Sequence, residues 1–286
     1  MNFIERLDEY QKEKNSLLCV GLDSDISQIP RSIKKYSNGV YHTIYNFNRK
    51  IISETSDFVC AYKINIAFYD SQWIEGLYAL GNTIDFIREE APDLPIILDA
   101  KRADIGNTNE QYAMQIFDVL KADAVTVNPY FGKESLDPFL KRADKGIIIL
   151  CRTSNPGAEE FQGMKVIDED VLRNLYEQVA RNVAFSWNKN NNCLLVVGAT
   201  NTNELRNVRM IVGEGMPILV PGIGAQKGNL EETLKVGLNE EGRGLIINSS
   251  RDIIFASKEK DFAKTAGEKA KELRDKINSI RIKMMG

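Results

Sequence analysis

The stretch Pro95-Ile-Ile-Leu-Asp99-Ala-Lys101-Arg-Ala-Asp104-Ile105 joins a short apolar run to a dense group of charges. The apolar part is bounded by proline and is typical of a buried strand. Residues i and i+2 of a strand share a face, so Asp99 and Lys101 should point the same way where the strand leaves the core. Charges this close together are costly to desolvate unless they pair. The pattern therefore indicates either a salt bridge at a barrel rim or a reaction centre.

Seven further apolar runs resemble this one, and all are continuous rather than alternating, as in parallel strands that are covered on both faces. The eight runs are 17–22, 58–62, 95–98, 124–127, 146–150, 193–197, 217–220 and 244–247. Patterns with helical spacing lie between them, at 41–54, 74–89, 108–120, 172–187 and 230–238. This alternation predicts an α/β fold, a (β/α)8 TIM barrel that forms one domain over 1–286.

Four segments outside this repeat carry further predictions. Residues 1–14 should form an N-terminal helix at the barrel base, and 262–283 an amphipathic C-terminal helix packed on the barrel. The connection 23–57 is long and should carry an extra helix before 41–54. The connection 153–168 contains Asn-Pro-Gly and Gln-Gly and is predicted as a long mobile loop, which in a compact domain is usually functional.

Composition excludes several classes of protein. The formal net charge is −3, the pI is near 5.5, and no basic tract is interleaved with aromatic residues, so nucleic-acid binding is not expected. No apolar run approaches the roughly 20 residues that a membrane helix requires, and the acidic N-terminus is no signal peptide, so we expect a cytoplasmic protein without membrane contact.

Cysteine and histidine usage narrows the chemistry. The four cysteines lie in or beside different apolar runs without a C-x-x-C pair, and are interpreted as buried hydrophobic residues. The one histidine, His42, has no G-x-S-x-G motif to accompany it. We therefore expect no metal site and no histidine nucleophile system, but chemistry that relies on lysine, aspartate and backbone groups.

Polar residues collect where the predicted strands end, and the active face of such a barrel is built there. They include Asp23, Lys63, Asn65, Asp99, Lys101, Asn128, Arg152, Thr153, Ser154, 221–227 and 248–251. A rim salt bridge needs one pair of charges, whereas Lys63, Lys101, Asp23 and Asp99 already give two lysines and two carboxylates. The concentration favours a reaction centre.

The last two of these loops predict a phosphate site. Pro221-Gly222-Ile-Gly-Ala-Gln226-Lys-Gly-Asn is glycine-rich, which lets backbone N–H groups approach an anion, and Ser250-Arg251 follows the eighth strand. Arginine can clamp a phosphate with two hydrogen bonds. Barrels of this class commonly bind phosphate with the loops after strands seven and eight.

Together these motifs resemble the orotidine 5′-phosphate decarboxylase family, and the resemblance covers nearly the whole chain. Its central D-x-K-x-x-D-I motif is present as Asp99, Lys101, Asp104 and Ile105, with a threonine at Thr108. Arg-Thr-Ser-Asn-Pro-Gly-Ala at 152–158 and Pro-Gly-Ile-Gly-Ala-Gln at 221–226 are similar to the longer-chain branch of the family.

The resemblance implies cofactor-independent decarboxylation of orotidine 5′-monophosphate to uridine 5′-monophosphate in pyrimidine biosynthesis. It implies that Lys101 protonates C6, that Asp99 lies near the substrate carboxylate, and that Lys63 joins the charge array. Asp104 and Thr108 would reach the neighbouring site of a homodimer. The substrate-binding residues that it implies are Asp23, Asn65, Ile105, Thr108, Thr153, Ser154, Pro221, Gly222, Gln226, Ser250 and Arg251.

Three alternatives stay open on the sequence. The first is a magnesium-dependent 3-keto-L-gulonate 6-phosphate decarboxylase, which shares the D-x-K-x-x-D motif; Ile105, Ser154 and Gln226 favour the nucleotide enzyme. The second is a Schiff-base aldolase, whose lysine should be uncharged, whereas Lys63 and Lys101 have carboxylate neighbours. The third is a non-catalytic barrel that binds a phosphate ligand, and it has no evident need for alternating lysine and aspartate.

Overall fold

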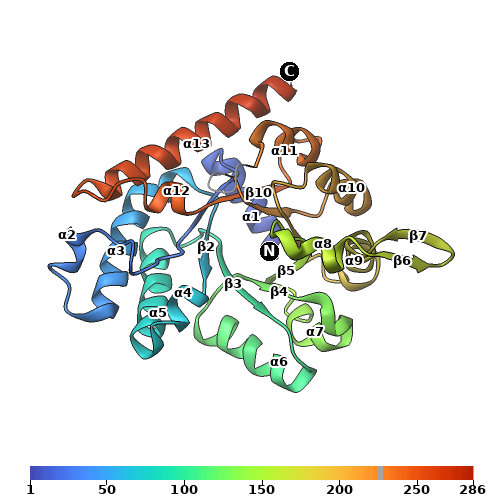
Figure 1. Ribbon diagram of the computed structural model, residues 1–286, viewed down its shortest axis with the longest axis horizontal. Coiled ribbons are helices and arrows are strands. Elements are labelled where there is room, and N and C mark those ends of the chain that lie inside the picture. Colours follow the sequence, from blue (N-terminus) through green and yellow to red (C-terminus); the bar gives the residue numbers. More distant parts are fainter. Residues whose placement is uncertain (224–227, 286) are drawn as a thin grey trace.

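The computed structural model describes residues 1–223 and 228–285, so Gln226 of the predicted phosphate loop lies outside the described residues. Eight parallel strands close into a barrel, in the order β1-β2-β3-β4-β5-β8-β9-β10 around the ring (Figure 1). The (β/α)8 TIM barrel predicted from the sequence is therefore confirmed. The barrel strands are β1 (Leu18–Gly21), β2 (Ala61–Asn65), β3 (Ile96–Arg102), β4 (Ala124–Val127), β5 (Gly146–Arg152), β8 (Cys193–Val197), β9 (Ile218–Pro221) and β10 (Leu245–Ser249).

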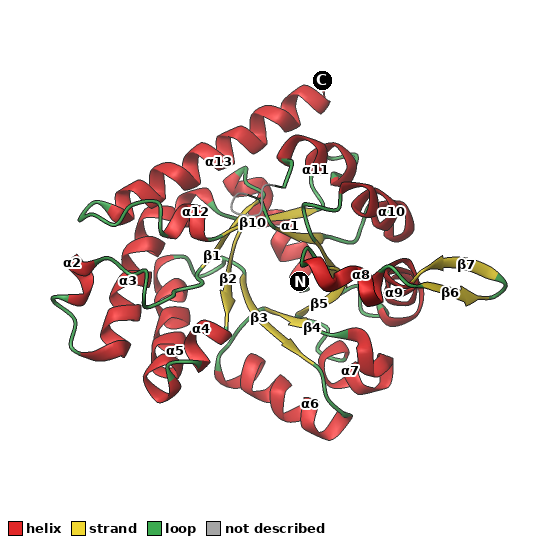
Figure 2. Cartoon of the chain, in the orientation of Figure 1, coloured by secondary structure: helices red, strands yellow, loops and turns green. Residues whose placement is uncertain are grey.

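Helices surround this ring (Figure 2). The longer ones are α1 (Phe3–Lys14), α3 (Gly39–Thr55), α5 (Trp73–Glu90), α6 (Gly106–Ala113), α7 (Gly132–Leu140), α9 (Leu175–Asn182), α10 (Thr202–Val212), α11 (Leu230–Gly237) and α13 (Phe262–Met285). Short helices are α2 (Arg31–Lys34), α4 (Ala67–Asp70), α8 (Glu159–Gln162) and α12 (Arg251–Ile254). Helices α6 and α9 continue as π-helical turns over Met114–Val119 and Val183–Trp187, and 3₁₀ turns occupy Ser56–Phe58, Pro129–Phe131 and Pro156–Ala158.

Helix α1 closes the amino-terminal end of the barrel. Asn2 caps it, and the Glu5 carboxylate accepts from the Asn2 backbone in return, which is a capping box. Phe3 and Leu7 pack with inward-facing strand residues in a core cluster of their own. Gly146 in β5 is required there, because a Cβ atom would lie 2.4 Å from the Phe3 ring. With this end filled by α1, the barrel interior opens at the carboxyl ends of the strands.

A second core cluster lies between the barrel and its helices, and α13 packs against α3 and α11 there. All four cysteines are buried free thiols, as their apolar surroundings in the sequence indicated. The extra helix expected in 23–57 is present as α2, ahead of α3. No helix within the described residues is long and apolar enough to cross a membrane.

The structure corrects where one predicted helix and one predicted strand begin. The helix predicted over 172–187 begins at Leu175, because 171–174 forms β7 (Val171–Asn174), which pairs antiparallel with β6 (Lys165–Asp168). Leu172 is 62% exposed, so its place in the apolar stripe was accidental. The strand predicted over 58–62 begins at Ala61, after a 3₁₀ turn.

The predicted loop 153–168 likewise contains regular structure, namely a 3₁₀ turn, α8 and β6. The hairpin β6–β7 projects from the barrel wall (Figure 1). Glu169 and Asp170 at its tip have φ angles of 50° and 61°, both in the left-handed region.

Candidate active site

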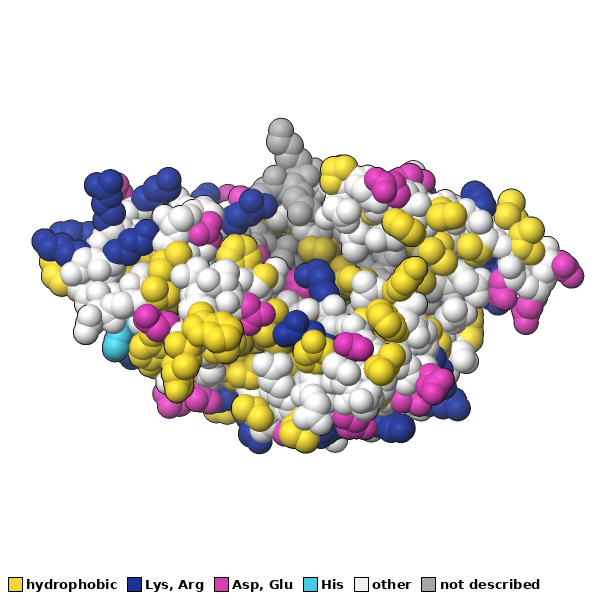
Figure 3. Space-filling model, turned by 60° about the horizontal axis from the view of Figure 1, so that its bottom comes forward, with side chains coloured by type: hydrophobic (Ala, Val, Ile, Leu, Met, Phe, Trp, Pro, Cys, Tyr) yellow, Lys and Arg dark blue, Asp and Glu magenta, His cyan; other side chains and the backbone are white. Residues whose placement is uncertain are grey.

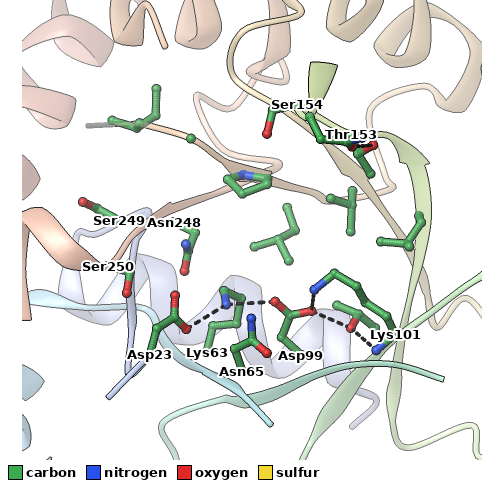
Figure 4. Close-up of a pocket in the computed structure, with 18 of the residues that line it drawn as sticks. Asp23, Lys63, Asn65, Asp99, Lys101, Thr153, Ser154, Asn248, Ser249 and Ser250 are labelled. Atoms are coloured by element: carbon green, nitrogen blue, oxygen red, sulfur yellow. Dashed lines mark hydrogen bonds and ion pairs between the residues drawn. The ribbon is translucent and has the colours of Figure 1, made fainter. Parts of the chain in front are cut away.

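A cavity of about 530 Å³ opens at the carboxyl ends of the barrel strands (Figure 4). Eleven of the predicted catalytic and substrate-binding residues line it: Asp23, Lys63, Asn65, Asp99, Lys101, Thr153, Ser154, Pro221, Gly222, Ser250 and Arg251. The lining further includes Thr126, Leu150, Asn155, Gln162, Val196, Leu219, Ile223, Asn248, Ser249 and Asp252. Residues from all eight barrel strands, or from the loops that directly follow them, thus meet in one cavity.

A chain of charges forms the floor of this cavity (Figure 4). The Lys63 ammonium lies 3.0 Å from Asp99 Oδ2 and 3.4 Å from Asp23 Oδ1. The second oxygen of Asp99 accepts a hydrogen bond of 2.6 Å from Lys101 Nζ. Lys63 is only 4% exposed, whereas the Lys101 side chain is 48% exposed. The array therefore has a buried, fully paired end and a cation that faces the open cavity.

The buried end of the array is held in its ionised form. Burial alone would raise the pKa of Asp99, but the charges of Lys63 and Lys101 and their hydrogen bonds outweigh it and hold that pKa well below its usual range. Burial would lower the pKa of Lys63, yet the charges of Asp99 and Asp23 raise it above the ordinary lysine value. Lys63 is therefore a fixed cation rather than a neutral amine.

Lys101 has an unusual backbone. Its φ is 47°, in the left-handed region that an L-residue with a long side chain rarely occupies. The pairing of β3 with β4 shifts register between Leu98 and Arg102, which is a bulge at this point. Such strain persists only where the surroundings enforce it, and it is often found at functional sites.

Thr126 of β4 enforces this conformation. Its hydroxyl accepts from the Lys101 backbone N–H at 2.9 Å and donates to Asp99 Oδ1 at 2.8 Å. Sequence reasoning missed Thr126. The available signal was the single hydroxyl in the apolar run Ala-Val-Thr-Val, on the strand that neighbours the charged motif.

A buried polar network fixes the chain next to Asp23. Asn48 of α3 accepts from the Ser24 hydroxyl at 2.6 Å and donates to the Tyr69 hydroxyl at 2.9 Å. Tyr69 donates in turn to the Leu22 carbonyl at 3.0 Å. The residues on both sides of Asp23 are thereby tied to the helical layer, which keeps its carboxylate beside Lys63.

One wall of the cavity is the segment that follows β5. Gln162 of α8 accepts from the Thr153 backbone N–H at 2.8 Å, and its amide donates to the Thr153 hydroxyl at 2.9 Å. Arg152 forms ion pairs with Glu159 at 2.7 Å and with Glu204 at 3.3 Å. These contacts fold 153–162 back onto its own start. Gln162 was also missed, since nothing local in the sequence shows that it returns to Thr153.

The opposite side of the cavity carries the predicted phosphate residues. Ser250 donates to the Gly21 carbonyl at 2.9 Å, and a Cβ at Gly21 would lie 2.8 Å from Ser250 Cβ. Gly222 has a φ of 100°, which suits glycine alone. Arg251 is exposed and begins α12. Asn248 Oδ1 is buried and has no hydrogen-bond partner within the described part of the chain.

Three predicted residues lie outside this chain's cavity. Asp104 and Ile105 precede α6, and Thr108 lies in its first turn. Asp104 Oδ1 accepts from the Ile105 backbone N–H at 2.7 Å, and Ile105 is 58% exposed. Over 1–223 and 228–285, no group of three or more histidine, cysteine, aspartate or glutamate residues is arranged to hold a metal ion.

Comparison with known proteins agrees with this geometry. The profile of the orotidine 5′-phosphate decarboxylase / HUMPS family matches residues 16–266. An orotidine 5′-phosphate decarboxylase of Azoarcus sp. is 48% identical over 281 residues, which are 98% of this chain and 100% of the relative. The structure of Leishmania donovani OMP decarboxylase superposes with a TM-score of 0.83 at 38% identity, covering 99% of both chains.

The structure of Leishmania donovani UMP synthase superposes with a TM-score of 0.85 at 38% identity and covers 98% of this chain. The chain spans only 57% of that longer protein. The matches extend over the barrel and over the strand ends that form the cavity. The chain belongs to the orotidine 5′-phosphate decarboxylase family.

Proposed function

We propose that this chain converts orotidine 5′-monophosphate to uridine 5′-monophosphate and CO2, without a cofactor, in the synthesis of pyrimidine nucleotides. The observation that carries the proposal is the array Lys63–Asp99–Lys101, which lines the same cavity as Ser250 and Arg251. A nucleotide offers both features that such a cavity would recognise, a phosphate at one end and a reacting base at the other.

Binding would use both ends of the cavity. Arg251, Ser250, the backbone of 221–222 and Gln226 would hold the phosphate, because an arginine fork and backbone N–H groups match its oxygens. Asp23, Lys63 and Asn65 would bind the ribose hydroxyls. Thr153 and Ser154 would bind the pyrimidine edge, on the wall that Gln162 folds inward. Energy from the phosphate would then be available to position the base.

The chemistry requires a cation at C6. When the bond from C6 to the carboxylate breaks, the electron pair stays on C6, and no carbonyl lies adjacent to delocalise it. The Lys101 ammonium would stabilise this developing charge and then transfer a proton from Nζ to C6, after which solvent reprotonates the amine. Asp99 and buried Lys63 would keep that ammonium in place and charged.

The same contacts argue against a Schiff-base mechanism at Lys63. Such a mechanism needs an unprotonated amine, whereas the carboxylates of Asp99 and Asp23 raise the pKa of Lys63. We propose further that the active form is a cytoplasmic homodimer in which Asp104 and Thr108 reach the partner's site, with no role for nucleic acid or a membrane. Exposed Ile105, at the start of α6, supports this because it leaves an apolar side chain in solvent.

The test follows the ultraviolet absorbance of orotidine 5′-monophosphate with purified wild type, Lys101→Ala and a matched control, Lys269→Ala on the exposed face of α13. We expect turnover by the wild type and the control, also in the presence of EDTA, and a loss of several orders of magnitude in kcat for Lys101→Ala. Turnover that EDTA abolishes would contradict the cofactor-free proposal. Full activity of Lys101→Ala would contradict the assigned proton donor.

A further inference from the structure

Two neighbouring cavities outside the active site both lie beside α2 and the segment that leads into α13. Their volumes are about 770 and 860 Å³, and they share Ser32, Tyr36 and Lys260 in their linings. Neither shares a lining residue with the active-site cavity. They are therefore adjoining spaces that the proposed decarboxylation does not use.

Positive charge is concentrated around these spaces. Seven cations line the two cavities together with only two carboxylates, Glu54 and Glu259, and we call these cations and the cavities the basic groove. The cations come from α2 and its end, from α3, and from the segment before α13: Arg31, Lys34, Lys35, Arg49, Lys50, Lys258 and Lys260. In Figure 3 dark blue side chains gather at the left end of the face shown, where Figure 1 places α2.

This clustering is unusual for the chain. The formal net charge of the whole sequence is −3, yet none of the seven cations has a carboxylate within 4.0 Å among the described residues. On α13, by contrast, three lysines are paired, namely Lys264 with Glu268, Lys269 with Glu272 and Lys271 with Asp275. Lys34 donates to the Ser27 carbonyl and Arg49 lies over the Phe86 ring, but neither contact supplies a negative charge. Like charges without carboxylate partners repel one another and destabilise the fold. An anionic ligand would offset that repulsion.

Two further groups in the basic groove indicate the kind of anion. Tyr36 is 80% exposed, and Lys35 Nζ lies 5.5 Å from the centre of its ring. An exposed ring among cations offers a face on which a nucleobase can stack. The Ser32 hydroxyl is buried and has no hydrogen-bond partner within the described residues, so a polar group in the cavity is left without a partner.

We propose that the basic groove binds a nucleoside polyphosphate, with its phosphates on the lysines and its base on Tyr36. The cavity volumes fall in the range of about 300–1,000 Å³ that small ligands occupy. A concave space with one exposed ring suits a single nucleotide better than a strand of nucleic acid, which would need a row of aromatic platforms.

The basic groove is connected to the active site through the chain itself. The connection between β1 and α3 carries Asp23 at one cavity and Lys35 at the other. The connection between β10 and α13 carries Arg251 and Lys260 in the same way. A nucleotide in the groove would therefore contact the two segments that also line the active site, although the sites are separate.

The test is calorimetric titration of the intact protein with ATP and with inorganic tripolyphosphate. Lys35→Gln/Lys260→Gln should weaken ATP binding about tenfold or more, because it removes two charge-assisted contacts. The control pair Lys269→Gln/Lys271→Gln makes the same change in net charge on α13 and should leave the affinity unchanged. Arg251→Gln, which affects the active-site cavity, should also leave ATP binding unchanged. Tyr36→Ala should weaken binding of ATP but not of tripolyphosphate.

Five results would overturn the proposal. One is no heat of binding at millimolar ATP, and another is equal weakening in the groove and control pairs. Loss of ATP binding in Arg251→Gln alone would place the nucleotide in the active-site cavity. Tighter binding of a short oligothymidine than of ATP, or an ATP affinity unaffected by Tyr36→Ala, would show a site for polyanions without recognition of a single base.

Discussion

Replacing Asp99 by asparagine should cost the fold about 3 kcal/mol, and the two lysines that contact it contribute very unequally. The Lys101 contact is shorter, at 2.6 Å, but the Lys101 side chain is 48% exposed, and ion pairs in contact with water contribute about 0–1 kcal/mol. The Lys63 contact at 3.0 Å is buried, and breaking a buried pair costs about 3–5 kcal/mol because it leaves an uncompensated charge. Asp23 still lies 3.4 Å from Lys63, which places the loss at the lower end of that range.

The measurement is urea unfolding of wild type, Asp99→Asn, Lys63→Met and the double variant at pH 7. The double variant should regain part of the loss, since it removes both buried charges, and Lys101→Met should lose less than about 1 kcal/mol. Because the pKa of Asp99 is lowered in the folded state, its stabilisation should be complete above the unfolded value of about 4 and should be lost as pH falls toward the folded value. An Asp99→Asn variant within 0.5 kcal/mol of wild type, a margin of about the usual effect of a surface substitution, would refute this reasoning.

Three further outcomes follow from local features. The free energy of unfolding of Lys101→Gly should exceed that of Lys101→Ala by about 1 kcal/mol, because only glycine accepts the φ of 47° without strain. Equal urea midpoints for the two variants would mean that the backbone relaxes. Burial raises the pKa of Cys60 to about 12, so the thiol loses its proton at lower pH in the unfolded chain than in the folded one. Between about pH 9 and pH 12 the free energy of unfolding of the wild type should therefore fall more steeply than that of Cys60→Ala, by about 1.4 kcal/mol per pH unit. Parallel pH profiles of the two proteins would show that the thiol titrates normally. Gly146→Ala should lower stability by about 1–3 kcal/mol because its Cβ would displace the Phe3 ring, and a Phe3→Leu background that does not reduce this loss would point to another cause.

Much of the architecture could be predicted from the sequence, for a physical reason. A strand buried on both faces must be continuously apolar, and eight such runs separated by helical patterns have few other ways to fold. The charged ends of β2 and β3 could be predicted too, because Lys63 and Asp99 directly follow apolar runs and Lys101 comes two residues after Asp99. Their convergence on one cavity follows from the parallel arrangement of the strands.

What the sequence could not show depends on contacts between distant segments. The return of Gln162 to Thr153 is set by how α8 packs, and the bond from Thr126 to the Lys101 backbone is set by strand register. The hairpin β6–β7 was predicted as loop and helix because Leu172 lies at a helical spacing from Leu175, although it is exposed. Spacing reports which side chains could share a face, and it does not report whether that face is covered.

The tip of that hairpin has a practical consequence for engineering. Glu169 and Asp170 both occupy left-handed backbone conformations, and the projecting strands on either side separate them from the barrel (Figure 1). Changes in length at an exposed tip cost only a slowly growing loop-closure entropy and disturb no packed layer. The junction between these two residues is therefore a place where a fluorescent label or a whole reporter domain could be inserted, and where the chain could lengthen in evolution while its catalytic end stays unchanged.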